Sequence, residues 1–161
     1  MPSTQDLLRL AYKTADKYSP DPSTKVGAII VRQDGTMHYG WNHLPAGFEH
    51  IDLLDRELKL KLMEHAERDA IYKTALYGGS LFGAVMFCPW AACCDCARAI
   101  TLSGIKEVVC HGEAIDQTPL RWQPDIVLAQ EIFQKNDVKY TKWYGKVGDC
   151  QNLFSGTYWY P

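Results

Sequence analysis

The second half of this sequence alternates between strand-like and helix-like segments, and this order restricts the fold more than any other feature. Apolar segments typical of strands cover residues 82–88, 105–110 and 138–144. Helical spacing of apolar residues lies between them, over residues 93–102 and 126–135. Strands that are joined by helices pair in parallel through right-handed crossovers. The second half therefore predicts an α/β fold with parallel strands.

The first half supplies a hairpin and further helices. Residues 25–32 and 36–41 form two strand-like segments joined by an Asp-Gly turn. A helix that begins after Ser3 is expected before the hairpin, and another is expected over residues 66–77 after it. We therefore predict a three-layer α/β/α fold, with a mixed five-stranded sheet and helices on both faces.

Length and patterning predict one domain over residues 1–161 with two additions. Residues 52–63 carry leucines at helical spacing between charged residues, which indicates a helical insertion. Residues 145–161 form a tail that is rich in aromatic residues but has no clear periodicity. We expect this tail to pack on its own domain or on a neighbouring subunit.

Composition argues against several classes of protein. With 17 basic and 19 acidic residues the formal net charge is −2, which argues against a protein that coats nucleic acid. No apolar run reaches the ~18 residues of a membrane span, and the N-terminal residues lack the pattern of a signal peptide. We expect no membrane or nucleic-acid partner, and a cytoplasmic location, which is the host cytoplasm for a viral protein.

Four of the six cysteines fall within nine residues, namely Cys88, Cys93, Cys94 and Cys96. This clustering is unlike the spread of cysteines in a secreted disulfide framework. In a reducing compartment such a cluster more often holds a metal ion or performs redox chemistry.

Two short motifs are the strongest candidates for chemistry: His-Ala-Glu at residues 65–67 and Cys-Cys-Asp-Cys at residues 93–96. Zinc accepts one imidazole and two thiolates and keeps its fourth tetrahedral position open for water. Cys93 and Cys96 are three residues apart, so at a helix start their sulfurs point the same way. The helix N-terminus also stabilises thiolates. The histidine motif shares this site only if it lies at the tip of its own helix.

Glu67 has a separate role in this interpretation, because it is not needed as a ligand. A carboxylate beside metal-activated water takes up a proton and returns it elsewhere, and such acid–base catalysis is typically worth ~10²–10⁴-fold in rate. Two other interpretations stay open at this point. The cysteines also fit a redox pair, or a closed structural zinc site with Cys94 or Cys88 as fourth ligand. Neither of these gives Glu67 a use.

Together the motifs resemble the signature of the zinc-dependent cytidine/deoxycytidylate deaminase superfamily, H-x-E…P-C-x-x-C. Within it, residues 19–28 (SPDPSTKVGA) look like the deoxycytidylate branch. Residues 41–45 (WNHLP) resemble that branch's Gly-Tyr-Asn-Gly-x-Pro loop, and residues 97–109 resemble its helix and strand after the zinc cysteines. The match spans roughly residues 5–140 and implies the cytidine deaminase-like fold.

The resemblance implies hydrolytic deamination of deoxycytidylate (dCMP) to deoxyuridylate (dUMP) and ammonia, which supplies dUMP for thymidylate synthesis. His65, Cys93 and Cys96 would hold one catalytic zinc ion per chain. Glu67 would protonate N3 of the cytosine ring and pass a proton to the departing ammonia. The alternatives are a related deaminase for dCTP, 5-modified dCMP or another nucleobase or nucleoside, and a non-catalytic zinc- or nucleotide-binding module.

Substrate contacts are implied by the same resemblance. Asn42 matches the family asparagine that contacts the sugar, and the backbone around Ala66 would read the edge of the base. Lys25 is a candidate for the phosphate on charge alone. Trp90 lies in the loop that lines the family's pocket, where Ala92 replaces the usual proline, and is a candidate wall for the base.

Regulation and assembly are further expectations from the family. The loop with Trp41 and His43 matches the site where dCTP activates and dTTP inhibits regulated members. His43 replaces their glycine, so we expect its imidazole to block the effector or to change its binding. A homo-oligomer, a hexamer by analogy, is expected. Residues 44–64 contain His50 but no cysteine, so no second zinc is expected.

Overall fold

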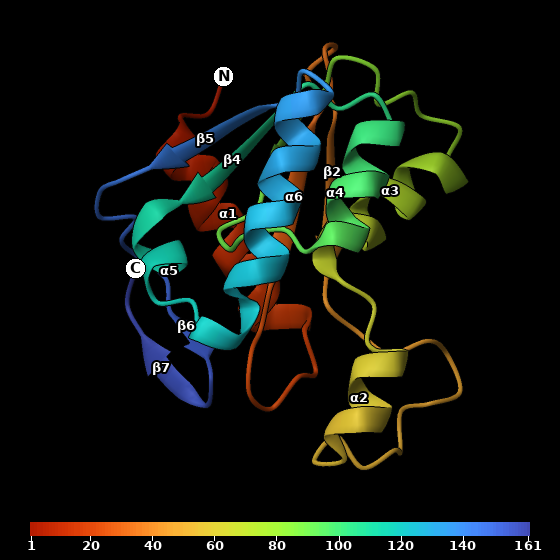
Figure 1. The fold of residues 1–161 in the computed structure, drawn as a ribbon, viewed down its shortest axis with the longest axis vertical. Coiled ribbons are helices and arrows are strands. Elements are labelled where there is room, and N and C mark those ends of the chain that lie inside the picture. The colour runs from red at the N-terminus through yellow and green to blue at the C-terminus, as the bar shows by residue number, and fades with distance from the viewer.

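Five strands form one mixed sheet in the order β2-β1-β3-β4-β5 in the computed structural model, which describes all 161 residues (Figure 1). They are β1 (Gly27–Val31), β2 (Met37–Trp41), β3 (Val85–Phe87), β4 (Glu107–His111) and β5 (Lys139–Trp143). β1 pairs antiparallel with both β2 and β3, whereas β4 lies parallel to β3 and β5 parallel to β4. The predicted mixed five-stranded sheet is confirmed.

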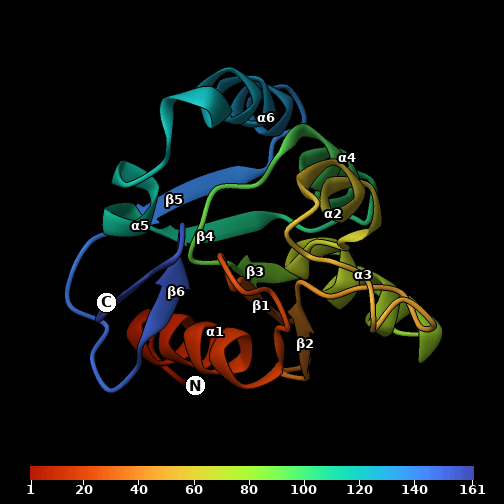
Figure 2. The same cartoon turned by 90° about the horizontal axis from the view of Figure 1, so that it is seen from below.

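Helices cover both faces of this sheet (Figure 2). One face carries α1 (Thr4–Tyr18), and the other carries α3 (Ala66–Leu76), α4 (Cys94–Leu102) and α6 (Gln123–Lys135). Ala28 and Ile30 of β1 pack in the core under α3, α4 and α6, whereas Ile29 and Val31 pack under α1. The predicted three layers are therefore present. None of the helices combines the length and the apolar character needed to cross a membrane.

The close approach of α3 to the sheet depends on Gly40 in β2. A Cβ atom at residue 40 would lie 2.2 Å from the carbonyl oxygen of Ala66, the first residue of α3. Only glycine therefore lets the N-terminal end of α3 lie directly on β2. Because Ala66 separates His65 from Glu67, this contact sets the height of the histidine motif above the sheet.

The segment 52–63 is helical only in its second half. α2 spans Arg56–Leu62, and it begins there because the Asp55 carboxylate caps it by accepting a hydrogen bond from the backbone N–H of Leu58. None of its residues is buried, and Figure 1 shows α2 apart from the sheet. The helix is therefore shorter than the predicted range.

The predicted strand over residues 82–88 was too long. Gly83 has a φ of 75°, and the N–H of Ala84 donates to the carbonyl of Leu81. This turn delays the strand until Val85, so that β3 has three residues. The sequence also did not predict two short helices after β4, namely α5 (Gly112–Asp116) and the 3-10 turn Leu120–Trp122.

The tail over residues 145–161 contains a hairpin that the sequence did not predict. β6 (Asn152–Phe154) and β7 (Thr157–Trp159) pair antiparallel. Each strand has three residues, which is too short for an alternating pattern to be recognised. The hairpin packs on its own chain: Asn152 donates to the carbonyl of Lys25, and the indole of Trp159 stacks on His111.

Candidate active site

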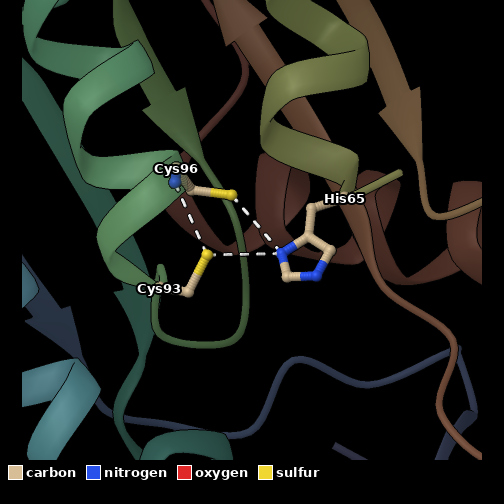
Figure 3. Close-up of side chains that lie close together, drawn as sticks. All are labelled: His65, Cys93 and Cys96. Atoms are coloured by element: carbon tan, nitrogen blue, oxygen red, sulfur yellow. Dashed lines mark hydrogen bonds between the residues drawn. The ribbon is translucent and has the colours of Figure 1, made fainter. Parts of the chain in front are cut away.

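The side chains of His65, Cys93 and Cys96 converge between the N-terminal ends of α3 and α4 (Figure 3). His65 is the residue immediately before α3, Cys93 is the residue immediately before α4, and Cys96 lies in the first turn of α4. At these positions each helix presents free N–H groups and the positive end of its dipole. The histidine motif lies at a helix tip, as a shared site with the cysteines requires.

The distances between these three side chains suit a tetrahedral zinc ion. Nδ1 of His65 lies 3.5 Å from Sγ of Cys93 and 3.5 Å from Sγ of Cys96. With Zn–N of ~2.1 Å and Zn–S of ~2.3 Å, the nitrogen and sulfur ligands of a tetrahedral zinc ion lie about 3.6 Å apart. The three residues therefore fit zinc, and the fourth coordination position remains for a non-protein ligand.

The alternative of a closed four-ligand site does not agree with the placement of the other cysteines. Cys94 points away, because its thiol donates to the backbone carbonyl of Asp125 at 3.3 Å. Cys88 is buried and does not belong to the converging group. With three protein ligands, one coordination position stays open, as in catalytic zinc sites and unlike in structural ones.

Cys93 is held in the form that binds metal. A hydrogen bond with the Cys96 thiol and a second one with His65 lower the pKa of Cys93 to about 4. A hydrogen bond with Cys93 and burial raise the pKa of Cys96. The backbone N–H of Cys96 also donates to Sγ of Cys93 at 3.5 Å. A thiolate at the tip of α4 is therefore stabilised by its own helix.

Glu67 lies in the first turn of α3 and is 4% exposed. Its side chain lines the same cavity as His65 and Cys93 but does not join the converging ligand atoms. Burial raises the pKa of Glu67. A carboxyl group with a raised pKa, next to an open metal position, is suited to accept a proton and to donate it again.

A network of side chains fixes the two helix tips relative to each other. The Glu64 carboxylate accepts the backbone N–H of His65 at 2.8 Å and the Nε–H of Arg68 at 2.6 Å. Arg68 also reaches Asp95 in the first turn of α4, at 3.6 Å. The main chain of His43 adds an antiparallel bridge to Glu64. Glu64, the residue before the histidine motif, is therefore connected to the loop of His43 and, through Arg68, to the first turn of α4.

A cavity of about 110 Å³ lies beside Glu67. Three of the predicted substrate residues line it, namely Asn42, Ala66 and Trp90. The sequence did not single out the five other lining residues, namely Asp21, Thr24, Val26, Met63 and Ala91. Apolar walls with a few polar groups are typical of small-molecule sites.

The amide of Asn42 is held on all sides by its own chain. Its oxygen accepts from the Ser19 hydroxyl at 2.6 Å and from the backbone N–H of Val26 at 2.8 Å. Its nitrogen donates to the carbonyl of Thr24 at 2.8 Å and, more weakly, to Asp21 at 3.4 Å. Asn42 therefore joins the loop after α1 to the end of β2, and the long contact to Asp21 is the one that a ligand would replace at least cost.

Asp21 is 3% exposed and accepts the backbone N–H groups of Ser23 and Thr24. The Lys59 ammonium of α2 lies 2.8 Å from this carboxylate and donates to the hydroxyl of Ser23 at 3.0 Å. Sequence reasoning missed Lys59, and no local signal marks it, because 38 residues separate it from Asp21.

Three predicted site residues lie outside this cavity. The Lys25 ammonium donates to the backbone carbonyl of Asp16 at 3.0 Å and does not line the cavity. The ring of Trp41 stacks on Tyr18, with Lys73 over its face. The imidazole of His43 contacts Asp69 at 2.9 Å and the carbonyl of Leu44 at 2.8 Å.

An α/β/α sandwich that presents one histidine and two cysteines from two helix tips, beside a buried glutamate, defines the class of zinc-dependent deaminases. The family described as the cytidine and deoxycytidylate deaminase zinc-binding region matches residues 1–112. The chain belongs to this family, and zinc is its cofactor.

Several known proteins are similar to this chain. A protein of Aliivibrio fischeri, described as an uncharacterized deaminase in the luxG 3′ region, is 33% identical over 127 residues and covers 77% of this chain and 82% of the relative. The deoxycytidylate deaminase of Enterobacteria phage T2 is 43% identical over 157 residues and covers 72% of this chain and 82% of the relative. The dCMP deaminase of cyanophage S-TIM5 shares the fold, with a TM-score of 0.67, 24% identity, and coverage of 87% of this chain and 96% of that protein. The cyanophage protein has also been solved in complex with dCMP and dUMP.

Proposed function

We propose that this protein hydrolyses dCMP to dUMP and ammonia. The observation that carries this function is the position of Glu67, a buried carboxyl group in one cavity with His65 and Cys93 but outside the ligand group. The phage T2 relative, which is named a deoxycytidylate deaminase, supports dCMP as the substrate. We assign the activity to the whole chain, residues 1–161, with residues 52–63 as an insertion and residues 145–161 as a tail.

His65, Cys93 and Cys96 would hold the zinc ion, since their ligand atoms have the spacing that zinc requires. Bound zinc supplies Lewis acidity and lowers the pKa of a coordinated water from 15.7 to about 7. The network around Glu64 keeps His65 in position for this role.

Glu67 moves the protons of the reaction. It takes a proton from the attacking water and delivers it to N3 of the cytosine ring while the water oxygen bonds to C4. It then passes the second proton of that water to the exocyclic amine, and the C4–N bond breaks as ammonia leaves. One water is consumed, the oxygen remains on the ring, and Glu67 returns to its starting state.

The cavity walls orient the base for this attack. The backbone around Ala66 reads the edge of the ring, and the indole of Trp90 forms a wall beside it. Asn42 contacts the sugar by exchanging its 3.4 Å contact with Asp21 for the ligand. Both Ala66 and Asn42 are buried, so these contacts form out of bulk water.

The test is ammonia release from dCMP, dCTP, 5-methyl-dCMP, CMP and deoxycytidine, with the zinc content of the same sample measured. We expect turnover of dCMP with about one zinc per chain. Faster turnover of another member of the panel would replace dCMP as the substrate. One zinc per chain without any turnover would contradict a catalytic role.

We infer that the chain also assembles into a homo-oligomer. Large apolar side chains are exposed around the C-terminal ends of α3 and α4, namely Leu76, Tyr77, Phe82 and Leu102. Their exposure supports a covered surface in an assembly. Sedimentation is expected to show a species larger than 18.3 kDa at assay concentrations, and a single species of that mass would contradict the assembly.

We further propose that dCTP and dTTP do not regulate this protein in the way expected of the regulated family members. The His43 imidazole, in the loop that matches the family's effector site, already contacts Asp69 and the carbonyl of Leu44, which supports this proposal. Rates of dCMP turnover with and without each nucleotide test this proposal. A rise with dCTP and a fall with dTTP would contradict it.

A further inference from the structure

We propose that the C-terminal hairpin β6–β7 is a positioning element of the active site, and that Phe154 acts through Trp90 to fix one wall of the substrate cavity. The hairpin lies beyond the residues that match the family, which end at residue 112. The proposal rests on the proposed function for its substrate. It adds a role for a segment that the chemistry does not use.

Trp90 separates the substrate cavity from the hairpin. Its indole lines that cavity on one side and, with Phe154, a small internal void of about 10 Å³ on the other. The Phe154 ring packs against the indole edge to face, with 5.1 Å between ring centroids and 83° between ring planes. At the other end, the indole N–H donates to the Thr118 hydroxyl at 2.8 Å. One hydrogen bond and one aromatic contact therefore hold the indole, in addition to the packing of Trp90 against the core.

A second cavity wall is joined to the same hairpin by four hydrogen bonds that involve the main chain. The N–H of Lys25 donates to the carbonyl of Leu153 at 2.9 Å, and the Asn152 amide donates to the carbonyl of Lys25 at 2.8 Å. The N–H of Ser155 donates to the Thr24 hydroxyl, and the N–H of Gly156 donates to the carbonyl of residue 23. Since Thr24 lines the cavity, one hairpin contacts both walls.

The hairpin is itself fixed to the core, so it provides a rigid support. The indole N–H of Trp159 donates to the side-chain oxygen of Asn152 at 3.2 Å. The same indole stacks on buried His111, with 10° between ring planes, and meets the ring of Tyr12 edge to face. Through Trp159, the hairpin behind Trp90 is therefore anchored to α1 and β4.

The physical consequence concerns binding more than the proton transfers. Removing the Phe154 ring enlarges the void behind Trp90 and removes one of the contacts that fix the indole, so that its position becomes less well defined. The wall must then be ordered each time a base enters, and this cost falls on substrate binding. We expect KM for dCMP to rise roughly 2- to 10-fold, the factor that corresponds to one aromatic pair. The turnover number should change less than 2-fold, since Glu67 and the ligands do not contact the hairpin.

The experiment compares Phe154→Ala with Phe154→Tyr, which keeps the ring, and with Tyr158→Ala as a matched control. Tyr158 lies on the same hairpin but is half exposed. KM, kcat, zinc content, thermal midpoint and the dissociation constant of dUMP are measured for each. A double-mutant cycle with Trp90→Ala completes the set, because two residues that act through one contact give non-additive effects.

We expect KM and the dUMP dissociation constant to rise in Phe154→Ala alone, to return in Phe154→Tyr, and to show no further rise from Phe154→Ala once Trp90 is alanine. Unchanged KM in Phe154→Ala, or additive effects in the cycle, would overturn the role of Phe154. Absence of dCMP turnover in the wild type contradicts the proposed function instead. The same variants are then compared on the active member of the substrate panel, where an unchanged KM overturns the positioning role. A wild type that neither turns over nor binds any of these compounds contradicts both proposals.

Discussion

The ammonium group of Lys59 lies 2.8 Å from the carboxylate of Asp21, which joins the exposed helix α2 to a buried residue of the cavity wall. No lysine or arginine lines the cavity itself. Both carboxylate oxygens of Asp21 and the hydroxyl of Ser23 lie within 3.0 Å of the Lys59 ammonium. We propose that a phosphate beside the Asp21 loop shares this group by replacing one of these contacts.

The variant Lys59→Met is therefore expected to weaken recognition of the 5′-phosphate. One charged hydrogen bond corresponds to a loss of about 10- to 100-fold in kcat/KM for dCMP. The rate for deoxycytidine, which has no phosphate, should fall much less, since only the unpaired Asp21 in the cavity wall affects it.

Two further variants serve as controls for Lys59. Lys61 lies on the same helix and pairs with Glu57 on its exposed side, so Lys61→Met should match the wild type. Lys25→Met tests the residue that charge alone suggested. A larger loss in Lys25→Met than in Lys59→Met would contradict the assignment to Lys59.

Replacing Glu67 by glutamine keeps the shape of the side chain and removes its ability to carry a proton. We expect kcat/KM for dCMP to fall about 10²–10⁴-fold, the usual contribution of a general acid–base group. Zinc content should stay at the wild-type value because Glu67 is outside the ligand group. Glu131→Gln, on the exposed side of α6, is the control. Full activity in Glu67→Gln would refute the proton shuttle.

The variant Cys96→Ser tests the metal site through zinc content and stability. Loss of one of three ligands should bring zinc well below one per chain after dialysis. The thermal midpoint should fall as well, since a ligand that binds only the folded state stabilises it. Cys150→Ser, which removes a thiol outside the converging group, should retain both zinc and stability. Retention of zinc in Cys96→Ser would exclude that residue from the ligand set.

Buried His111 predicts a loss of stability in acid. Its Nδ1 lies 2.8 Å from the Tyr12 hydroxyl and its Nε2 lies 3.1 Å from the carbonyl of Gly145. Burial lowers the pKa of His111, although Glu113 at 2.9 Å acts in the opposite direction. The unfolded chain takes up its proton near pH 6.5. Below that pH the unfolded state binds more protons than the folded state, so stability is complete above about 6.5 and declines as the pH falls.

Thermal midpoints measured between pH 7.5 and 5.5 test this sign. The midpoint should fall on acidification in the wild type and should fall less in His111→Gln. His50→Gln, at an exposed position, should follow the wild type. A wild-type midpoint that rises on acidification would contradict the direction.

The sheet and the metal-binding group could be predicted because their signals are local. Ala28 to Val31 form an apolar run that is typical of a buried strand, and Cys93 and Cys96 carry their chemistry in residue type and spacing. Lys59 and Phe154 could not be found in this way. Their partners, Asp21 and Trp90, lie 38 and 64 residues away, and only the folded chain brings each pair together.

The prediction for Lys25 has the same physical limit. Its charge suggested a phosphate contact, but the charge of a residue does not predict where its side chain points. Its ammonium donates to the carbonyl of Asp16 in α1, and Lys25 does not line the cavity beside Glu67. A lysine that follows a turn has no sequence feature to distinguish these two directions.

The order of residues along the chain separates the two parts of the active site in time. The three converging ligands have all left the ribosome once residue 96 has emerged, whereas the hairpin that supports both cavity walls comes at residues 152–159. A nascent chain thus presents its complete set of metal ligands more than fifty residues before it has a finished binding surface. The ligands are therefore present in the chain long before the hairpin that completes the binding surface.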